Sequence, residues 1–343
     1  MNNEIHLTDN LRVRELKKLE TPAKLKALLP LGDDLTQKVV SDREAVRNII
    51  HLRDPRLLVV IGPCSIHDPA AALDYARRLA QLAEAVKNRY FIVMRVYFEK
   101  PRTTIGWKGF INDPHLDNSC DMEHGLYAAR KLMLDIAQLG LPIATEFLDP
   151  IVPQYTADLV SWSAIGARTT ESQTHREMSS GLSMPVGFKN ATDGNIQVAI
   201  NAIESASTPH SFLGIDQDGQ TAVVKTAGNP NTHLVLRGGE KQPNFELPEV
   251  TYAACKLEAA GLDSSIMVDC SHANASKVAR NQINVWNTIL KQRKKADCPI
   301  TGTMIESFIE EGNQKITPDL KYGLSITDSC IDWLTTKALL TSA

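Results

Sequence analysis

Short apolar runs rich in Val, Ile and Leu alternate along the chain with longer stretches in which apolar residues recur every three or four positions. The short runs predict eight strands, at 57–61, 91–96, 143–147, 164–166, 186–188, 233–236, 266–268 and 300–304. The longer stretches predict helices, among them 69–86, 122–139, 195–206, 248–260 and 277–291. Eight repeats of strand and helix predict an α/β fold, a (β/α)8 TIM barrel with a parallel sheet.

The N-terminal stretch does not follow this alternation. Residues 1–50 are rich in charge and contain few strand-like runs. Between residues 11 and 29 one or two short helices are expected, with Pro22 and Pro30 as breaks. We therefore expect residues 1–50 to form an extension that serves regulation or oligomerisation, and residues 51–343 to form the catalytic barrel.

A second segment, 210–226, also departs from the alternation. It contains two further β-like runs, 211–215 and 221–225, on either side of an Asp-Gly pair. Asp-Gly between two such runs is a strong signal for a β-hairpin. We predict a hairpin inserted into the barrel just before its sixth strand.

Composition narrows the classes of function. Of the 343 residues, 37 are basic and 40 acidic, which gives a net charge of -3 and no basic field for nucleic acid. The chain has neither a signal-peptide pattern at its N-terminus nor an apolar run near the ~18 residues of a membrane span. Six cysteines in a chain of this length without a signal peptide favour reduced thiols, and the absence of a CxxC pair disfavours a zinc-ribbon or thioredoxin-like site. We expect a cytoplasmic enzyme without a nucleic-acid or membrane partner.

Polar residues follow every predicted strand. In a TIM barrel these positions converge on one site at the carboxyl ends of the strands. Five of them are cations, and a sixth residue, Glu146, follows the third strand. The cations are Arg95, Lys100, Arg168, Lys189 and Arg237. One such residue alone could be a salt bridge at the rim, but five cations at one point require an anionic ligand, such as a phosphate or a carboxylate.

A second group of strand-end residues has metal-binding chemistry. Cys64, His272 and Glu306 follow the first, seventh and eighth strands, and Asp328 lies further along. Together they offer a mixed sulfur, nitrogen and oxygen donor set for one divalent ion. This set does not choose among manganese, iron, cobalt and zinc. Each residue alone also has a structural alternative: a buried thiol, a satisfied histidine, or a helix cap.

The loop after the second strand, 99–118, is long and rich in Gly, Pro and charge. It contains Lys100-Pro101-Arg102-Thr103-Thr104, in which basic side chains, hydroxyls and backbone amides form a phosphate cradle. The alternative is a solvated loop with a turn fixed by proline. From the residues alone, we expect two anionic substrates and a metal.

Six motifs, in order, resemble the type I 3-deoxy-D-arabino-heptulosonate 7-phosphate (DAHP) synthases, which open the shikimate pathway to chorismate and the aromatic amino acids. The motifs are GPCSIHD at 62–68, KPRTT at 100–104, GARTTES at 166–172, GFKN at 187–190, LRGG at 236–239 and DCSH at 269–272. The similarity runs from about residue 9 to near the C-terminus. It implies a transferase that joins phosphoenolpyruvate, D-erythrose 4-phosphate and water to give DAHP and phosphate.

The resemblance also implies residue roles. The metal ligands are Cys64, His272, Glu306 and Asp328. The phosphoenolpyruvate site is Arg95, Lys100, Glu146, Gly166, Ala167, Arg168, Lys189 and Arg237. The erythrose 4-phosphate site is Pro101, Arg102 and Thr103. For catalysis, we expect Glu146 to position or deprotonate the water. Lys100 is expected to protonate the new alkoxide, with a pKa lowered by the neighbouring cations.

In this family the extension and the hairpin build a feedback site for an aromatic amino acid, which a neighbouring subunit completes. The residues that match it are Asp9, Gln154, Met178, Leu182, Ser183, Phe212, Gly214 and Val224. The alternative is plain packing of helix on hairpin. Gly214 leaves space for a phenol hydroxyl where serine would crowd it, so we expect tyrosine as the inhibitor and phenylalanine as the second choice. A shared site implies a homodimer or homotetramer.

Two other functions fit parts of the sequence. A related synthase uses arabinose 5-phosphate, but its aldehyde-side loop differs from residues 100–104. A catalytically silent sensor of the same fold should have lost part of the metal set or of the cation ring, and this chain retains both.

Overall fold

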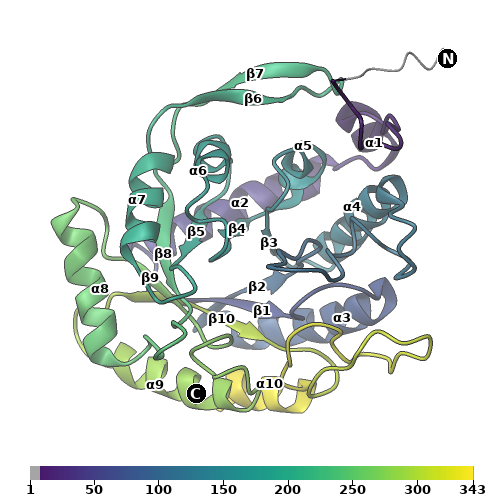
Figure 1. Ribbon diagram of the computed structural model, residues 1–343. Coiled ribbons are helices and arrows are strands. Elements are labelled where there is room, and N and C mark those ends of the chain that lie inside the picture. Colours follow the sequence, from purple (N-terminus) through teal and green to yellow (C-terminus); the bar gives the residue numbers. More distant parts are fainter. Residues whose placement is uncertain (1–7, 343) are drawn as a thin grey trace.

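Eight parallel strands close into a barrel in the computed structural model, which describes residues 8–342 (Figure 1). Around the barrel the strands follow the order β1-β10-β9-β8-β5-β4-β3-β2. Their bounds are β1 Leu57–Gly62, β2 Tyr90–Arg95, β3 Ile143–Glu146, β4 Trp162–Ile165, β5 Val186–Lys189, β8 Thr232–Leu236, β9 Ile266–Asp269 and β10 Ile300–Glu306. The predicted TIM barrel is confirmed.

Helices surround the barrel. They are α1 Pro22–Leu28, α2 Asp33–Ile50, α3 Pro69–Val86, α4 Met122–Gln138, α5 Val152–Thr156, the 3-10 turn η1 Ala157–Leu159, α6 Gln173–Ser180, α7 Gln197–Ala206, α8 Leu247–Ala259, α9 Asn281–Arg293 and α10 Trp333–Thr341. Local sequence explains their starts: the Asp68 carboxylate caps α3 through the amides of Ala70 and Ala71, and Pro69 occupies the first turn. None of the helices within residues 8–342 is long and apolar enough to cross a membrane.

The helix expected at 277–291 begins four residues later than predicted, at Asn281. Ser276 and Lys277 have positive φ angles of 51° and 60°, which belong to the left-handed region and end any right-handed helix there. Lys277 is therefore a loop residue at the mouth of the barrel.

Two apolar layers hold the barrel together. The outer layer lies between the strands and the surrounding helices, and the inner layer fills the barrel itself. Helix α2 contributes Val46, Ile49 and Ile50 to the inner layer, where they pack in one cluster with strand residues such as Leu58 and Val60. Part of the charge-rich extension is thus amphipathic and belongs to the barrel core.

The predicted hairpin is confirmed as β6 Ser211–Ile215 and β7 Thr221–Lys225, a separate antiparallel pair (Figure 1). Its turn reaches α1: the Gln217 carbonyl accepts a hydrogen bond from the Ala23 amide at 2.8 Å. The Gln217 side chain accepts from Lys26 Nζ at 3.0 Å and donates to Gln154 Oε1 at 2.7 Å. The hairpin therefore ties the extension to α5 at one point.

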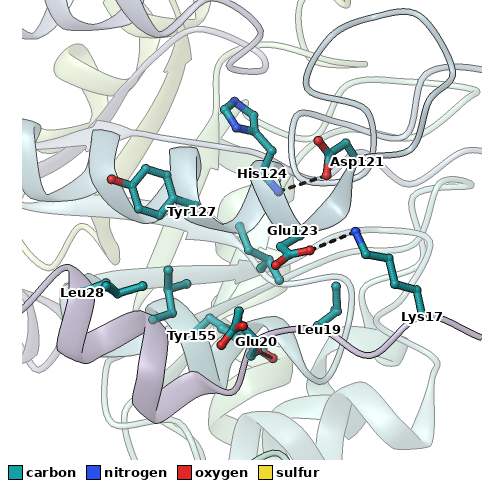
Figure 2. Close-up of a pocket in the computed structure, with 11 residues that line it drawn as sticks. Lys17, Leu19, Glu20, Leu28, Asp121, Glu123, His124, Tyr127 and Tyr155 are labelled. Atoms are coloured by element: carbon teal, nitrogen blue, oxygen red, sulfur yellow. Dashed lines mark hydrogen bonds and ion pairs between the residues drawn. The ribbon is translucent and has the colours of Figure 1, made fainter.

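Ahead of α1 the chain crosses α4 without regular structure (Figure 2). Lys17 forms an ion pair with Glu123 at 2.9 Å, and the Tyr155 hydroxyl donates to the Glu20 carbonyl at 2.8 Å. Between this segment, α1, α4 and α5 lies a hollow of about 390 Å³, here named the arm pocket. Its lining residues are Lys17, Leu19, Glu20, Leu25, Leu28, Asp121, Glu123, His124, Leu126, Tyr127 and Tyr155.

Candidate active site

A cavity of about 300 Å³ opens at the carboxyl ends of the barrel strands. Its lining residues are Lys100, Pro101, Arg102, Thr103, Thr104, Ile105, Glu146, Gly166, Ala167, Arg168, Lys189, Arg237, His272, Lys277 and Asp328. All residues that the sequence analysis assigned to the two substrates are among them except Arg95. Loops that are far apart in the sequence thus bring these side chains to one place.

Three of the four candidate metal ligands lie close together beside this cavity, which His272 and Asp328 line. Ligand atoms of Cys64, Glu306 and Asp328 all lie within 4.8 Å of one another. His272 Nε2 lies 3.9 Å from Glu306 Oε1, while its Nδ1 lies 2.8 Å from Asp269 Oδ2. An imidazole held through Nδ1 by a carboxylate keeps Nε2 for a metal, so the donor set fits a divalent ion.

Asp269 is the buried centre of a small polar network. It is fully buried, accepts hydrogen bonds from the Ser271 amide and hydroxyl, and pairs with Lys189 Nζ at 3.0 Å. Although burial raises the pKa of Asp269, Lys189 and His272 hold it well below its usual range. The network fixes both Lys189 and His272 at the cavity floor.

Arg95 lies beneath the cavity, with only 1% of its surface exposed. Its guanidinium donates to the carbonyls of Pro63 and Cys64 and to Glu306 Oε1, each at 3.1 Å. It also lies over the ring of Tyr97, 3.6 Å from the centroid. In this geometry Arg95 holds the loop after β1 and Glu306 in place.

Glu146 is buried at the end of β3, and within residues 8–342 its Oε1 has no hydrogen-bond partner. A buried carboxylate oxygen without a partner is costly, so this atom is arranged for a ligand. Gly166, at the end of β4, allows the arrangement, because a Cβ there would lie 2.2 Å from Glu146 Oε1.

Lys100 lies between the residues assigned to the substrates and the cluster of candidate metal ligands. Its Nζ donates to the Cys64 carbonyl and thiol, both at 3.2 Å. Burial lowers the pKa of Lys100, but the negative charge of neighbours such as Cys64 and Glu306 outweighs this effect and leaves the pKa raised. The expected lowering by neighbouring cations is therefore wrong, because Cys64, Glu306 and Glu146 together outweigh both burial and Arg95. Burial raises the pKa of the Cys64 thiol.

The loop after β2 forms the outer wall of the cavity. Glu99 and Gly109 make an isolated antiparallel bridge at its base. Near its tip, Thr103 Oγ1 accepts from Arg168 Nε at 2.9 Å, and Arg102 Nε donates to the Trp107 carbonyl at 2.8 Å. The contact between Thr103 and Arg168 joins the sugar-phosphate loop to the phosphoenolpyruvate side of the cavity.

The residues expected to bind an inhibitor lie on the other side of α5 and α6. Phe212 and Val224 are paired across the hairpin, and Met178 is buried on α6. A Cβ on Gly214 would lie 2.9 Å from Val224 Cγ2, so a larger residue would displace that side chain. Leu182 is packed against the core and Ser183 is exposed.

Two expected contacts of this site are engaged elsewhere. Gln154 is bound to Gln217 at the hairpin turn. Asp9 is exposed, and its carboxylate accepts hydrogen bonds from its neighbour Asn10. The roles of all these residues in inhibitor binding stay predictions.

Lys277 and Asp269 were not assigned a role from the sequence. Asp269 is the last residue of β9 and the first of the DCSH motif, so its place at a strand end could have identified it as a site residue. Lys277 was hidden by its assignment to a helix.

A closed parallel barrel with cations and a thiol–carboxylate cluster at one mouth, beside the His272 imidazole, defines a class, the (β/α)8-barrel enzymes that act on anionic substrates. Within that class, the chain belongs to the DAHP synthetase I family, whose model matches residues 27–341. The chain is thus an enzyme of the DAHP synthase type, and the resemblance seen in the sequence is confirmed.

Individual relatives agree. The chain is 55% identical to the Tyr-sensitive phospho-2-dehydro-3-deoxyheptonate aldolase of Escherichia coli over 98% of this chain and 94% of that protein. It is 53% identical to the Phe-sensitive enzyme of the same organism, over 97% and 95%. The solved structure of the aldolase from Francisella tularensis covers 96% of each chain with a TM-score of 0.94 and 49% identity.

Proposed function

We propose that the chain condenses phosphoenolpyruvate with D-erythrose 4-phosphate and water in the cavity at the barrel mouth, giving DAHP and inorganic phosphate. The observation that carries this proposal is a cavity walled by cations, which the cluster of Cys64, Glu306 and Asp328 adjoins through Asp328. Two phosphorylated substrates need the first, and activation of an aldehyde needs the second.

Phosphoenolpyruvate binds the half of the cavity formed by β3 to β8. Arg168, Lys189 and Arg237 supply positive charge for its phosphate and carboxylate, and Gly166 and Ala167 supply a close backbone wall. Arg95 acts from below, by holding the loop after β1. This arrangement fixes the enol carbon toward the aldehyde and lowers the entropic cost of the reaction.

Erythrose 4-phosphate binds against the loop after β2. Pro101, Arg102 and Thr103 line that wall, and the Thr103–Arg168 hydrogen bond lies where the two substrates meet. Arg102 uses its Nε for the Trp107 carbonyl, and the two terminal nitrogens of its guanidinium remain as donors for the sugar phosphate.

One divalent ion, manganese, iron, cobalt or zinc, is held by Cys64, His272, Glu306 and Asp328. When bound, it supplies Lewis acidity for the aldehyde oxygen. Removal of metal by a chelator should abolish turnover. When a divalent metal is added back, turnover should return in proportion to the metal content found by elemental analysis. A Cys64→Ala variant should bind less metal by the same analysis. Full metal content in that variant would refute the assignment.

Lys100 and Glu146 move protons. With its raised pKa, Lys100 is charged at neutral pH and donates a proton to the alkoxide that forms from the aldehyde. Glu146, with a free buried oxygen, holds or deprotonates the water that adds to the enol carbon before phosphate leaves by C–O cleavage. Near-native turnover of Lys100→Met would refute the first role.

The test of the reaction is direct. Phosphoenolpyruvate should disappear and inorganic phosphate should appear in equal amounts only when erythrose 4-phosphate is present. Replacing this aldehyde with arabinose 5-phosphate should reduce turnover strongly. Equal rates with both aldehydes would favour the related synthase instead.

We also propose feedback inhibition by tyrosine at a site made by Gln154, Met178, Leu182, Ser183, Phe212, Gly214 and Val224, with Asp9 of a neighbouring subunit. The chain is 55% identical to a Tyr-sensitive relative and 53% identical to a Phe-sensitive one. Gly214 supports tyrosine as well, because it has no side chain to crowd a phenol hydroxyl, as serine would. Inhibition by phenylalanine alone would contradict this proposal.

A site shared between subunits requires a homodimer or homotetramer, built with the extension 1–50, in a cytoplasmic enzyme. Light scattering of the full chain should give twice or four times the mass of one chain. A monomer that tyrosine still inhibits would rule out a shared site, and cell fractionation tests the location.

A further inference from the structure

The loop after β9 presents one cation to the cavity that the proposed roles leave unused. Lys277 lines the cavity together with His272 and Asp328, and the same residue lines a smaller hollow beside Glu306. Its side chain is exposed, and its amide donates to the His272 carbonyl at 2.9 Å. In the barrel, β9 is the neighbour of β8, so Lys277 continues the row of cations that ends at Arg237.

The backbone of this loop is strained where it carries Lys277. Its φ angle is 60°, and Ser276 beside it has 51°. A side chain in the left-handed region is unfavourable, and such residues persist where the surroundings hold them. Here Asn274 holds the loop through the carbonyls of Leu236 and Asp269, at 3.1 and 2.8 Å.

The charge balance of the cavity leaves room for this cation. Lys189 is paired with Asp269, and Arg95 is paired with Glu306 beneath the cavity. Each substrate phosphate carries about 1.5 to 2 negative charges at neutral pH, and phosphoenolpyruvate adds a carboxylate. The cavity cations that have no carboxylate partner within residues 8–342 must balance these charges together with the proposed metal.

We propose that Lys277 is a substrate-binding residue that holds a phosphate group of one of the two substrates at the mouth of the barrel. The proposal rests on the proposed function, since it takes the ligand to be a phosphate monoester bound in this cavity. Lys277 binds as a point charge on a flexible stem, while the strained loop sets the direction from which that stem enters.

The test uses the strain itself. Lys277→Gly removes the ammonium and also relieves the left-handed backbone. The KM of one substrate should rise about tenfold or more, the loss expected for a charged hydrogen bond, with kcat changed less. The melting temperature should stay the same or rise. Lys277→Arg should keep most of the affinity, and the substrate whose KM moves identifies the phosphate.

The matched control is Ser276→Gly. This neighbour has the same backbone conformation and is exposed, but it lines neither hollow. It should gain the same backbone relief and leave both KM values unchanged. Lys277→Met removes the charge without changing the backbone and should reproduce the higher KM.

A binding measurement separates this proposal from the proposed function. Calorimetric titration of the metal-loaded full chain with phosphoenolpyruvate alone, and with erythrose 4-phosphate alone, at low and high salt should show weaker and less salt-dependent binding of one of them in Lys277→Met. Unchanged binding and unchanged KM values would overturn the role of Lys277. Loss of metal without loss of substrate affinity would also overturn it, because Lys277 would then only position Asp328. Failure of the wild type to form DAHP would instead refute the proposed function.

Discussion

The cavity at the barrel mouth and the arm pocket are similar in volume, about 300 and 390 Å³, but they have opposite linings. Loops after the strands supply the first with cations and carboxylates. Helices α1, α4 and α5 supply the second with leucine and tyrosine side chains, and the Lys17–Glu123 ion pair and Glu20 lie beside them (Figure 2). Charged groups in the cavity depend on buried partners, whereas the arm pocket combines apolar packing with an exposed ion pair, Lys17–Glu123. Size alone therefore says little about function.

The largest effect should come from breaking a charge pair under the cavity. Lys189→Met leaves the fully buried Asp269 without its cation, which should lower the free energy of unfolding by about 3–5 kcal/mol and abolish activity. The exposed Arg168 serves as the control: Arg168→Met should raise KM and leave stability nearly unchanged. Urea denaturation and steady-state kinetics measure both. Equal stability of the two variants would remove the distinction between buried and exposed cations.

In the arm pocket a substitution should lower stability and leave activity unchanged. Leu25 is 5% exposed on α1, and Leu25→Ala should cost about 2–5 kcal/mol of stability because it leaves a void. The kcat should stay at the wild-type value. Leu28→Ala, on the same helix but 60% exposed, is the control and should change little. A fall in kcat for Leu25→Ala would mean that the arm pocket is connected to the chemistry.

The same contrast explains what could be predicted from the sequence. Strands of the barrel are continuous apolar runs, so their positions and the residues after them follow from local pattern. Lys277 was assigned to a helix because its neighbours have helical spacing, and only three-dimensional contacts such as those of Asn274 show the left-handed turn. Helix α2 was not predicted, because charged residues surround its apolar positions. Those positions are recognised as a buried stripe only from their contacts with the barrel strands. Pairing of distant groups, as in Arg95 with Glu306, has no local signal.

A buried acid at the base of the loop after β2 makes the stability of the folded chain depend on pH. Burial raises the pKa of Glu99 to about 8, although the amides of Asp149 and Leu148 donate to it. The folded state then holds a proton that the unfolded chain releases near pH 4.5. Stability from this group is complete below pH 4.5 and is lost as pH rises to about 8, by at most about 1.4 kcal/mol per pH unit.

The measurement compares wild type with Glu99→Gln by urea denaturation from pH 5 to pH 9. Their difference in free energy of unfolding should shift steadily in favour of the variant up to about pH 8 and then stay constant. A constant difference over the whole range would mean that Glu99 has an ordinary pKa.

The smallest effect should be found where the hairpin meets the extension. Gln217→Ala removes the side-chain hydrogen bonds to Lys26 and Gln154, which together should contribute about 0.5–1.5 kcal/mol in this exposed setting. Activity without inhibitor should not change. Asp218→Ala, one residue further along the turn, provides the comparison. A loss of unfolding free energy as large as that of Leu25→Ala would show that polar contacts stabilise the surroundings of the arm pocket as much as apolar packing does.

Helix α2 has a practical consequence for shortening the chain. A protease that cuts between α1 and α2 would separate α1 and the segment before it from a barrel that keeps its inner apolar layer. A cut after Ile50 would take away Val46, Ile49 and Ile50 and expose that layer to water. The smallest fragment that can remain a folded catalyst therefore begins no later than Asp33, well before the first barrel strand.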